Sequence, residues 1–574
     1  MQFNDHRNIL YNAGVETTLE YTRPERVRKK APSIKLLISA FNIPFCPIEI
    51  VSTNVNAIIL SCSFEKSRST PAGSVILTMA GDRDALENIH LPVAGHSFFK
   101  SRWDQFGPDL RDIFKPMSIA QLWINGYCAC TGFVRFCRRQ ASSNGAVRYI
   151  AQIDELGAIY EGNILSFDTV TAGTNDDVND TSGSLGAAGS TGTLQQMTKI
   201  MEMSGQMGAI PLPDALQSYV RSFLLSQMWI PNSIPPFMML SDGTPMFSRF
   251  IAAEAPLGAL ATMSSVEMLT VDSAMIQNAQ GGNFWGFLKG LLPDPYMELF
   301  TETGGRTIVT GRFGMSMPTP MLAGMNYLVA RSTPYEVLWT GISPWLATQY
   351  IYCLGALDLI LGGDYVIITD DDIFDKDLGQ SDSQQFTHFF ANLGGRLGSA
   401  GNCSRMPPSI AGGPKVPLYP GGVRTFGRRQ FEATIPATSY LAEGLSGQSL
   451  EDTYRSYRLP INVPTLATML NVWFRNASKF NEGTVKTRCM GYARPGMYLL
   501  YLPSLSGSRV ECARDIGLYY IDNVTHSYEL GKPDTSTFSL IRGVPIPMDM
   551  QGGMRLLFDW EIIPPMPALF DGGL

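Results

Sequence analysis

The sequence predicts a β-rich α+β fold, and three observations support that prediction. Runs of alternating apolar and polar residues recur along the 574 residues, and 55 Gly and 37 Pro supply turns between them. Asn-Gly pairs, which favour tight hairpins, stand at Asn125-Gly126 and Asn144-Gly145. Helical periodicity appears in the middle of the chain and in patches of residues 400–480 such as Leu466–Phe474. A chain of this length is expected to form roughly three or four domains.

The first 33 residues form a polar arm that ends in a basic cluster. Its members are Arg23, Arg26, Arg28, Lys29 and Lys30. One interpretation is a solvated arm, and the other is a tail that docks on an acidic neighbouring subunit.

Residues 34–170 are predicted to form the first β domain. Apolar alternation marks strands at Ile34–Phe41, Ile48–Glu65 and Ser74–Met79. A three-stranded antiparallel meander should follow, because Asn125-Gly126 supplies the positive φ angles of a type I′ turn. Its strands are Ile119–Ile124, Tyr127–Arg139 and Val147–Asp154.

Residues 171–193 are expected to be a flexible loop, and residues 194–330 an α+β middle domain. The loop is rich in Gly, Ser, Thr, Asn and Asp, which bury little apolar surface. A Met-rich helix at Thr193–Gly208 and an amphipathic helix that opens at Pro213-Asp214 should pack as core. A short aromatic helix at Asn283–Leu292 and strands at Tyr296–Thr301 and Tyr327–Ser332 complete the domain.

A second β domain is predicted from residues 331–399 and 481–545, with residues 400–480 as a loop-rich insertion and 546–574 as an extension. Asp364–Thr369, Thr387–Leu393 and Gly496–Leu502 have the composition of strands. The clearest hairpin closes the domain, because Gly531-Lys-Pro-Asp534 is a turn between strands Leu518–Leu530 and Thr535–Arg542.

Composition argues against several classes of protein. A net charge of −7 disfavours nucleic acid or an anionic membrane as the main partner, and a charged fraction of only 17% suggests a surface covered by other subunits. Nine cysteines at irregular spacing favour synthesis in a reducing cytoplasm.

No targeting or membrane segment is predicted. The polar start Met1–Arg7 is not a signal peptide. The apolar window Leu338–Leu361 contains Pro344, Gln349 and Asp358, so it predicts buried core and no membrane span. An outer-membrane barrel is disfavoured by the uneven strand runs.

Two clusters have residue types that could bind a metal ion, and neither is predicted to be a metal site. Asp370, Asp371, Asp372, Asp375 and Asp377 could offer oxygens to Ca²⁺ or Mg²⁺, but the segment lacks the turning Gly and the later Glu of a calcium loop. A solvated turn is the preferred interpretation. A second set is Cys128 and Cys130, with Cys137 further along; alternate cysteines on one strand face are usually small core residues, and no second pair stands at zinc-finger spacing.

No catalytic residue, cofactor site or metal site is predicted. The five histidines are scattered: His6, His90, His96, His388 and His526. His526 is expected to be a structural hydrogen-bonding residue in a strand. A cell-wall hydrolase would have room only in 400–480, where the carboxylates are Glu432, Glu443, Glu451 and Asp452. The chain is therefore expected not to be an enzyme.

Several segments, taken in order, resemble the central hub proteins of contractile phage tail baseplates and related injection systems. Near the end are Arg494-Pro495-Gly496, the Tyr-rich strand Tyr519–Tyr528 with Val524-Thr525-His526-Ser527, and a strand that ends in Arg542-Gly543. Earlier segments resemble motifs of the same family and follow in the same order. They are Pro71-Ala72-Gly73 within Val55–Met79, the strand-turn-strand Ala120–Phe136, Asn283-Phe284-Trp285, Glu298-Leu299-Phe300, Arg331–Tyr335 and Ser381-Asp382.

The resemblance implies two tail-tube-like antiparallel β-barrel domains, at 34–170 and at 331–399 with 481–545, around the α+β middle region. It also implies a homotrimer in the virion whose pseudo-sixfold ring adapts the hexameric tail tube to the trimeric central spike. The tape-measure protein and baseplate wedge proteins are further candidate partners. The alternatives are another virion β protein, of a fibre or capsid, or a hub with a fused hydrolase activity. The additions at 1–33, 171–193, 400–480 and 546–574 have no counterpart in compact hubs.

Overall fold

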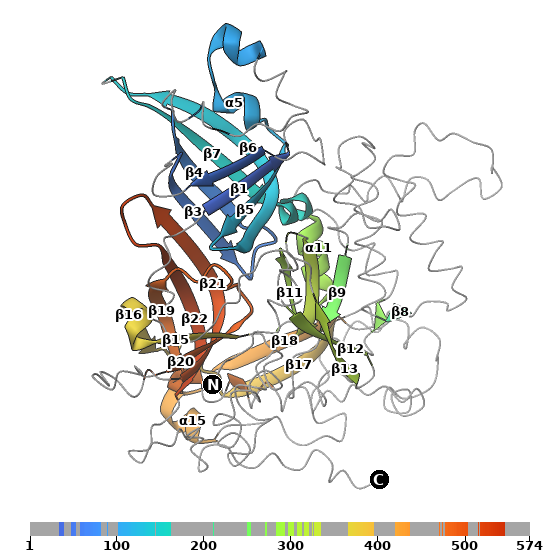
Figure 1. Ribbon diagram of the computed structural model, residues 1–574. Coiled ribbons are helices and arrows are strands. Elements are labelled where there is room, and N and C mark those ends of the chain that lie inside the picture. Colours follow the sequence, from blue (N-terminus) through green and yellow to red (C-terminus); the bar gives the residue numbers. More distant parts are fainter. Residues whose placement is uncertain are drawn as a thin grey trace, which may run out of the picture.

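The computed structural model contains one large sheet with two curled halves, and a smaller α+β region lies against it (Figure 1). The structure describes residues 34–39, 48–52, 58–81, 86, 89, 101–143, 145–161, 210–211, 249–253, 270–271, 283–292, 295, 297–303, 307–312, 315–320, 324, 326–333, 365–394, 420–436, 470, 473–474, 477–502, 515 and 517–545. The expected arm, the 171–193 loop, the helices at Thr193–Gly208 and after Pro213, and the C-terminal extension lie outside these residues.

The first half of the large sheet is built from seven strands between residues 34 and 155. They are β1 Ile34–Ser39, β2 Ile48–Ser52, β3 Ile59–Ser67, β4 Ser74–Ala80, β5 Ile119–Ile124, β6 Tyr127–Ala141 and β7 Val147–Glu155. The predicted meander is confirmed, since β5, β6 and β7 pair antiparallel in succession. The single run predicted at Ile48–Glu65 contains two strands with different partners: β2 pairs with β1, whereas β3 pairs with β4 and β21.

The turn between β5 and β6 has the predicted backbone. Asn125 has φ 52° and Gly126 φ 87°, as a type I′ turn requires at both central positions. The two strands can therefore reverse within two residues.

The second half of the sheet is built from six strands between residues 365 and 545. They are β15 Tyr365–Thr369, β16 Ile373–Gln380, β19 Asn481–Arg488, β20 Tyr498–Leu502, β21 Gly517–Glu529 and β22 Thr535–Pro545. The closing hairpin is confirmed: β21 and β22 pair antiparallel, and Lys532 N donates to Glu529 O at 2.9 Å within the turn.

The two halves form one continuous 13-stranded sheet. Its order is β16-β19-β22-β21-β3-β4-β7-β6-β5-β1-β2, and β20 with β15 branches from β21. The junction is the antiparallel pairing of β3 with β21, from Ser61 opposite Glu529 to Ser67 opposite Asn523. We call this junction the seam. Each half curls around its own apolar core, one that includes Phe64, Leu77 and Ile153 and one that includes Val485, Tyr519 and Phe538.

The halves repeat one topology. Strands β3, β4, β7 and β6 are neighbours in that order, and β16, β19, β22 and β21 repeat it with the same sequence order and antiparallel pairing. β5 beside β6 corresponds to β20 beside β21. A register shift between Val134 and Phe136 in β6 recurs between Ile521 and Asn523 in β21. One difference is that β1 runs antiparallel to β5, whereas β15 runs parallel to β20.

The middle region contains a helix and a small mixed sheet. The helix α11, Phe284–Leu291, begins at the predicted place, with the Asn283 side chain accepting from Gly286 N at 2.8 Å. The sheet joins β11 Met297–Glu302 to β14 Tyr327–Ser332 and β9 Arg249–Ala253.

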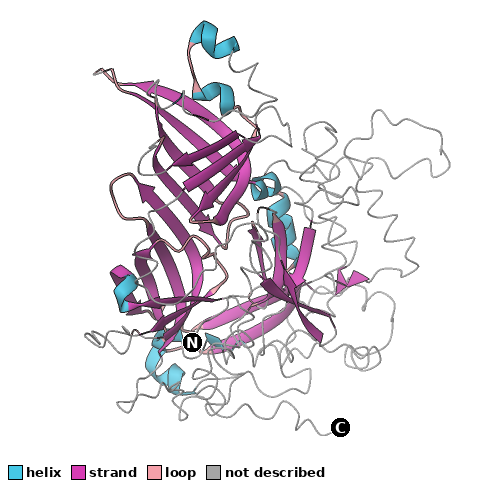
Figure 2. Cartoon of the chain, viewed as in Figure 1, coloured by secondary structure: helices cyan, strands magenta, loops and turns pink. Residues whose placement is uncertain are grey.

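The remaining described elements are short. The strands are β8 Ile210–Pro211, β10 Thr270–Val271, β12 Thr307–Arg312, β13 Met315–Pro320, β17 His388–Gly394 and β18 Gln430–Pro436; the helices and 3₁₀ turns are α5 Leu110–Ile113, η2 Leu156–Tyr160, η5 Asp370–Asp372, α15 Pro420–Phe426 and η6 Ala477–Lys479. β17 pairs with β18 in a separate two-stranded sheet. Mostly antiparallel β structure with few helices confirms the predicted fold class (Figure 2). Among the described residues, no helix has the length and apolarity needed to span a membrane.

Candidate functional site

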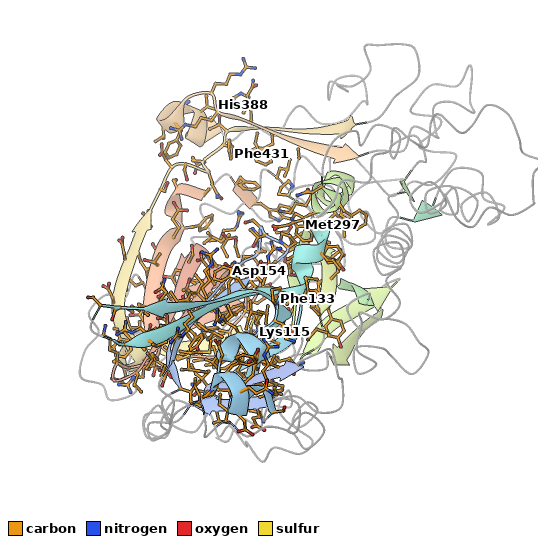
Figure 3. All side chains as sticks on the ribbon, turned by 90° about the horizontal axis from the view of Figure 1, so that it is seen from above. Lys115, Phe133, Asp154, Met297, His388 and Phe431 are labelled. Carbon is orange, nitrogen blue, oxygen red and sulfur yellow. The ribbon has the colours of Figure 1, made fainter. Side chains whose placement is uncertain are left out.

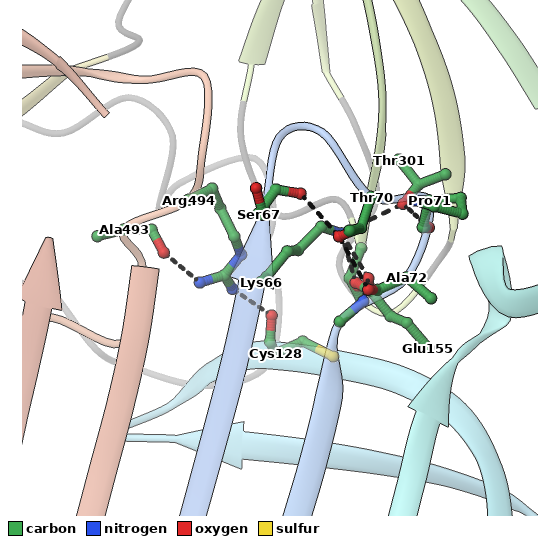
Figure 4. A network of polar contacts seen from close by, with 12 residues as sticks. Lys66, Ser67, Thr70, Pro71, Ala72, Cys128, Glu155, Thr301, Ala493 and Arg494 are labelled. Atoms are coloured by element: carbon green, nitrogen blue, oxygen red, sulfur yellow. Dashed lines mark hydrogen bonds and ion pairs between the residues drawn. The ribbon is translucent and has the colours of Figure 1, made fainter. Parts of the chain in front are cut away.

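A buried ion pair, Lys66 with Glu155, lies where the seam meets the middle region. Lys66 Nζ is 2.7 Å from Glu155 Oε1 and 2.6 Å from Oε2, and the two side chains are 3% and 0% exposed. Gly73 N donates to Oε2 at 2.8 Å, and Thr303 donates to Oε1 at 2.6 Å. The carboxylate is thus bound by three donor groups from β3, its following turn and the end of β11 (Figure 4). A buried pair is tolerated when its remaining hydrogen-bonding capacity is used in this way.

A second ionic contact, centred on Glu298 of β11, joins both halves of the sheet to the middle region. Arg68 Nη1 is 2.7 Å from Glu298 Oε2, and Arg68 Nε is 3.2 Å from Asp522 Oδ1. The Tyr520 hydroxyl donates to Glu298 at 2.6 Å and 2.7 Å to the two oxygens. The guanidinium of Arg68 also lies over the Tyr520 ring, 5.4 Å from its centre. Three chain segments that are distant in sequence are therefore held by four side chains.

Arg494, from the Arg494-Pro495-Gly496 motif, makes a third connection across the halves. Its guanidinium donates to Gly491 O at 2.6 Å, to Ala493 O at 2.9 Å, and to Cys128 O in β6. The side chain is 4% exposed. Gly496, with φ 83°, lets the turn bring its N–H to Ile521 O at 2.8 Å. The motif is thus an anchor between the second half and the first hairpin of the meander.

His526 is buried in β21 and hydrogen-bonded at both ring nitrogens, as expected from the sequence. Nδ1 lies 2.7 Å from Ser536 Oγ, and Nε2 lies 3.3 Å from Ala493 O. Since a carbonyl can only accept, Nε2 carries the proton, and Ser536 donates to Nδ1 while accepting from Met490 N at 2.8 Å. Burial, with a smaller contribution from the charge of Arg494, lowers the pKa of His526 to about 3. The ring is therefore neutral at physiological pH.

The Ser536–His526 pair has the atoms of a nucleophile and its base, but its surroundings suit a structural role. Ser536 is 0% and His526 1% exposed, so no substrate could reach the hydroxyl. The second ring nitrogen binds a backbone carbonyl where an activating carboxylate would be needed. What the pair does is fix β21 against β22 and the Arg494 turn.

The aspartates of 370–377 point to different partners. Asp372 accepts from Thr369 N at 3.1 Å and from the Thr369 hydroxyl at 2.8 Å, which caps the η5 turn. Asp370 accepts from the Tyr501 hydroxyl. Asp375 and Asp377 are exposed on β16, beyond the turn that the sequence predicted to hold the whole segment. Over the described part of the chain, no group of three His, Cys, Asp or Glu side chains is arranged to hold a metal ion.

The three cysteines considered as ligands are free thiols in or beside the first core. Cys128 and Cys130 are buried, and Cys137 is partly buried. The Cys128 sulfur lies 3.6 Å from the Thr131 hydroxyl. Desolvation raises the pKa of Cys128 to about 11 and that of Cys137 to about 12, so both are protonated at neutral pH.

The other candidate residues are dispersed or lie outside the described residues. His388 Nδ1 is 3.0 Å from the Thr387 hydroxyl, and burial followed by the charge of Arg428 lowers the pKa of the ring below its usual value. Figure 3 shows His388 and Phe431 well apart from Asp154 and Phe133. Glu432 lies on β18. Outside the described residues are His6, His90, His96, Glu443, Glu451 and Asp452.

Sequence reasoning missed the Lys66–Glu155 pair, although a signal was present. The inward positions of β3 read Cys62, Phe64, Lys66, and those of β7 read Ala151, Ile153, Glu155. Each apolar series ends in a charge of opposite sign. Charges at positions that alternation assigns to the core indicate a buried pair.

No protein-family model matches the chain. No curated protein matches it either. Solved structures do. The tail protein from Neisseria meningitidis MC58 matches with a TM-score of 0.40 at 9% identity, over 89% of this chain and 97% of that one. The 43 kDa tail protein of prophage MuSo2 from Shewanella oneidensis matches with a TM-score of 0.37 at 11% identity, over 89% and 98%.

A third match is the E. coli c3393 protein, a component of the type VI secretion system described as structurally similar to bacteriophage T4 tail proteins gp27 and gp5. Its TM-score is 0.33 at 10% identity, over 91% of this chain and 79% of that one. These neighbours are tail and injection-system proteins, the class that the ordered motifs of the sequence resemble.

Proposed function

We propose that this chain is a structural hub of a phage-type tail, and that three copies close into a ring of six similar β units. The observation that carries the proposal is the internal repeat: β3, β4, β7 and β6 are followed in space by a second set with the same order, β16, β19, β22 and β21. Three copies of a twofold-repeated chain present six similar units to a hexameric tube and three identical ones to a trimeric spike. Such a ring would adapt one symmetry to the other.

The two faces of the repeated strands also suit a ring around a channel. The inward face of each half packs on an apolar core, while the other face carries polar side chains. On β3 and β21 these are Ser61, Ser63, Glu65, Thr525 and Ser527, each half-buried or exposed. A water-filled channel requires such a polar wall.

The seam network supports a mechanical role. A hub must transmit load between tube and spike without its halves separating, and here the strand pairing of β3 with β21 is reinforced by the Glu298 contacts and by Arg494. The Lys66–Glu155 pair holds β3 to β7 and, through Thr303, to the middle region. The proposed partners are further copies of the chain, a spike protein and a tail tube protein, in the virion tail. No enzymatic step is part of this function.

Analytical ultracentrifugation of the purified full chain, with negative-stain imaging, tests the proposal. The expected result is a particle of three times the 63.0 kDa chain mass that averages to a threefold ring with a central channel. A monomer at micromolar concentration, elongated rods or closed shells would rule out the hub.

A further inference from the structure

The large sheet has two strand segments with an open edge. Beyond Val134, β6 pairs with β7 alone, from Phe136 to Ala141. At the other end of the strand order, β16 pairs with β19 alone, from Ile373 to Gly379. No strand of the described residues occupies the second edge of either segment. Open edges of this length present unpaired backbone groups that another chain can bind.

The internal repeat shows how these edges fit each other. In the repeat β21 corresponds to β6, and β3 corresponds to β16. The seam pairing of β21 with β3 within one chain therefore has a counterpart that no single chain can make, namely β6 with β16. The segment of β21 used in the seam, 523–529, follows its register shift, just as the open segment of β6 follows its own.

The register of a β6–β16 contact between copies can be inferred from the register of the seam. When β21 and β6 are matched at their register shifts, Asn523 corresponds to Phe136. Thr525 then corresponds to Arg138, and Ser527 corresponds to Gln140. Paired residues can then be followed from strand to strand across each half, from β6 to β3 and from β21 to β16. By this route Ser63 corresponds to Asp377, and Glu65 corresponds to Gly379. In the seam, Ser527 is opposite Ser63 and Thr525 is opposite Glu65.

We propose that β6 of one copy pairs antiparallel with β16 of a second copy, with Gln140 opposite Asp377 and Arg138 opposite Gly379. This inference rests on the proposed ring and names the contact that closes it. A contact between two different surfaces of one chain is head-to-tail, and it closes when the rotation between copies completes a circle.

Charge complementarity supports the same register independently. Arg138 and Arg148 are exposed and lie on one face of the β6–β7 hairpin, because Gln140 is opposite Arg148 and both Arg138 and Gln140 point to that side. The guanidinium of Arg138 lies over Phe136, 4.6 Å from the ring centre. Within the described residues neither arginine is in an ion pair, and the same holds for the exposed Asp377.

The proposed register brings these charges together across the contact. Asp377 of the second copy would lie opposite Gln140 and diagonal to Arg138, and β6 would separate it from Arg148 on β7. Diagonal neighbours in a sheet are within reach of long side chains, and opposite charges there favour the intended register. A slip by one residue would turn Asp377 to the other face of the sheet.

Engineered disulfides measure the register directly. A chain with Gln140→Cys and Asp377→Cys, oxidised at micromolar concentration, should form covalent dimers and trimers on a non-reducing gel, since opposite residues have the separation that a disulfide requires. The control is Gln140→Cys with Asp375→Cys, in which the second cysteine is displaced by two residues on the same strand. The parent chain reports any cross-linking by native cysteines. Equal cross-linking of both pairs, or none in a chain that sediments as a trimer, would overturn the register.

Charge reversal tests the ionic part in solution. Arg138→Glu is expected to raise the dissociation constant of the assembly by about tenfold or more, because it places two carboxylates together. Asp377→Arg should have a similar effect, and the chain that carries both changes should regain association. Circular dichroism of each variant confirms that the exposed substitutions leave the fold intact. Failure of the double variant to regain association while both single variants lose it would contradict the pairing.

The outcomes separate this inference from the proposed function. A parent chain that is a trimer, with charge reversals that leave its mass unchanged, retains the hub and removes the β6–β16 contact. A parent chain that does not form a trimer removes the hub itself.

Discussion

At the scale of single residues, the described polar groups serve to hold strands together. Lys66, Glu155 and Glu298 are buried charges at positions where an apolar side chain would be ordinary, and each is bound by partners from another segment, including the partly exposed Arg68. Such pairs add little net stability over apolar residues, but they are costly to break and they select one arrangement of the segments. The seam is therefore expected to be sensitive to changes of one residue.

Glu155→Gln is predicted to destabilise the fold strongly. It removes the charge that neutralises buried Lys66, and breaking a buried pair in this way costs about 3–5 kcal/mol. Urea denaturation measures the loss. The matched control is Glu49→Gln in the exposed pair with Lys35, whose atoms are 2.8 Å apart and whose side chains are 46% and 40% exposed. That change should cost less than about 1 kcal/mol, and equal losses in the two variants would show that burial of the pair is unimportant.

His526 and Asp534 should oppose each other in the pH dependence of stability. The folded pKa of His526, about 3, is below its ordinary 6.5, so its contribution is complete above pH 6.5 and falls as the pH drops toward 3. Desolvation raises the pKa of Asp534 from 3.8 to about 7, so that group favours folding below pH 3.8 and loses this contribution as the pH rises through 7. Between pH 3.8 and 6.5 the two slopes have opposite signs.

Variants should reveal each slope. His526 is expected to lower the free energy of unfolding by about 1.4 kcal/mol for each pH unit between pH 6 and 4. His526→Gln should remove this part of the pH dependence. Asp534→Asn should stabilise the fold at pH 8 more than at pH 4, because Asp534 carries a partly buried charge at pH 8 and Oδ1 has no hydrogen-bond partner in the described residues. Melting temperatures at the two pH values provide the test, and a larger gain at pH 4 would contradict the assignment for Asp534.

At the scale of elements, the local pattern predicted most strands, and the physical reasons for the exceptions are visible. Alternation of apolar residues located β4, β5, β7 and β21 within one or two residues of their bounds. It missed β16 and β19, whose sequences IFDKDLGQ and NEGTVKTR contain few apolar residues. Their inward positions are filled by Lys376, Leu378, Val485 and Thr487, too polar a series to signal a strand.

The Asn125-Gly126 turn should be the most sensitive hairpin position. Gly126→Ala places a Cβ at φ 87°, which is expected to cost about 1 kcal/mol or more. Gly290→Ala in α11 is the control, since a Cβ there meets no atom within 4 Å and alanine favours a helix. Thermal melts should show a loss for the first variant and none for the second; an equal loss would mean that the backbone of the turn is not what limits this site.

At the scale of the whole molecule, local pattern could not predict the seam. β3 and β21 meet across most of the chain, as the Asn523–Glu65 hydrogen bond at a separation of 458 residues illustrates. Pairing at that distance depends on the curl of both halves and on the contacts of Arg68 and Arg494, none of which is encoded in a window of ten residues. The order of motifs indicated the class of protein, while the repeat of topology and the open edges emerged only from the structure.

In the proposed ring, the repeat within one chain continues from one chain to the next through the pairing of β6 with β16. A cryo-EM map of the purified assembly tests it most directly. We expect a threefold ring in which Phe136–Ala141 of each copy lies beside Ile373–Gln380 of the next, with Gln140 opposite Asp377. A ring that closes through other strands, or a particle without threefold symmetry, would contradict it.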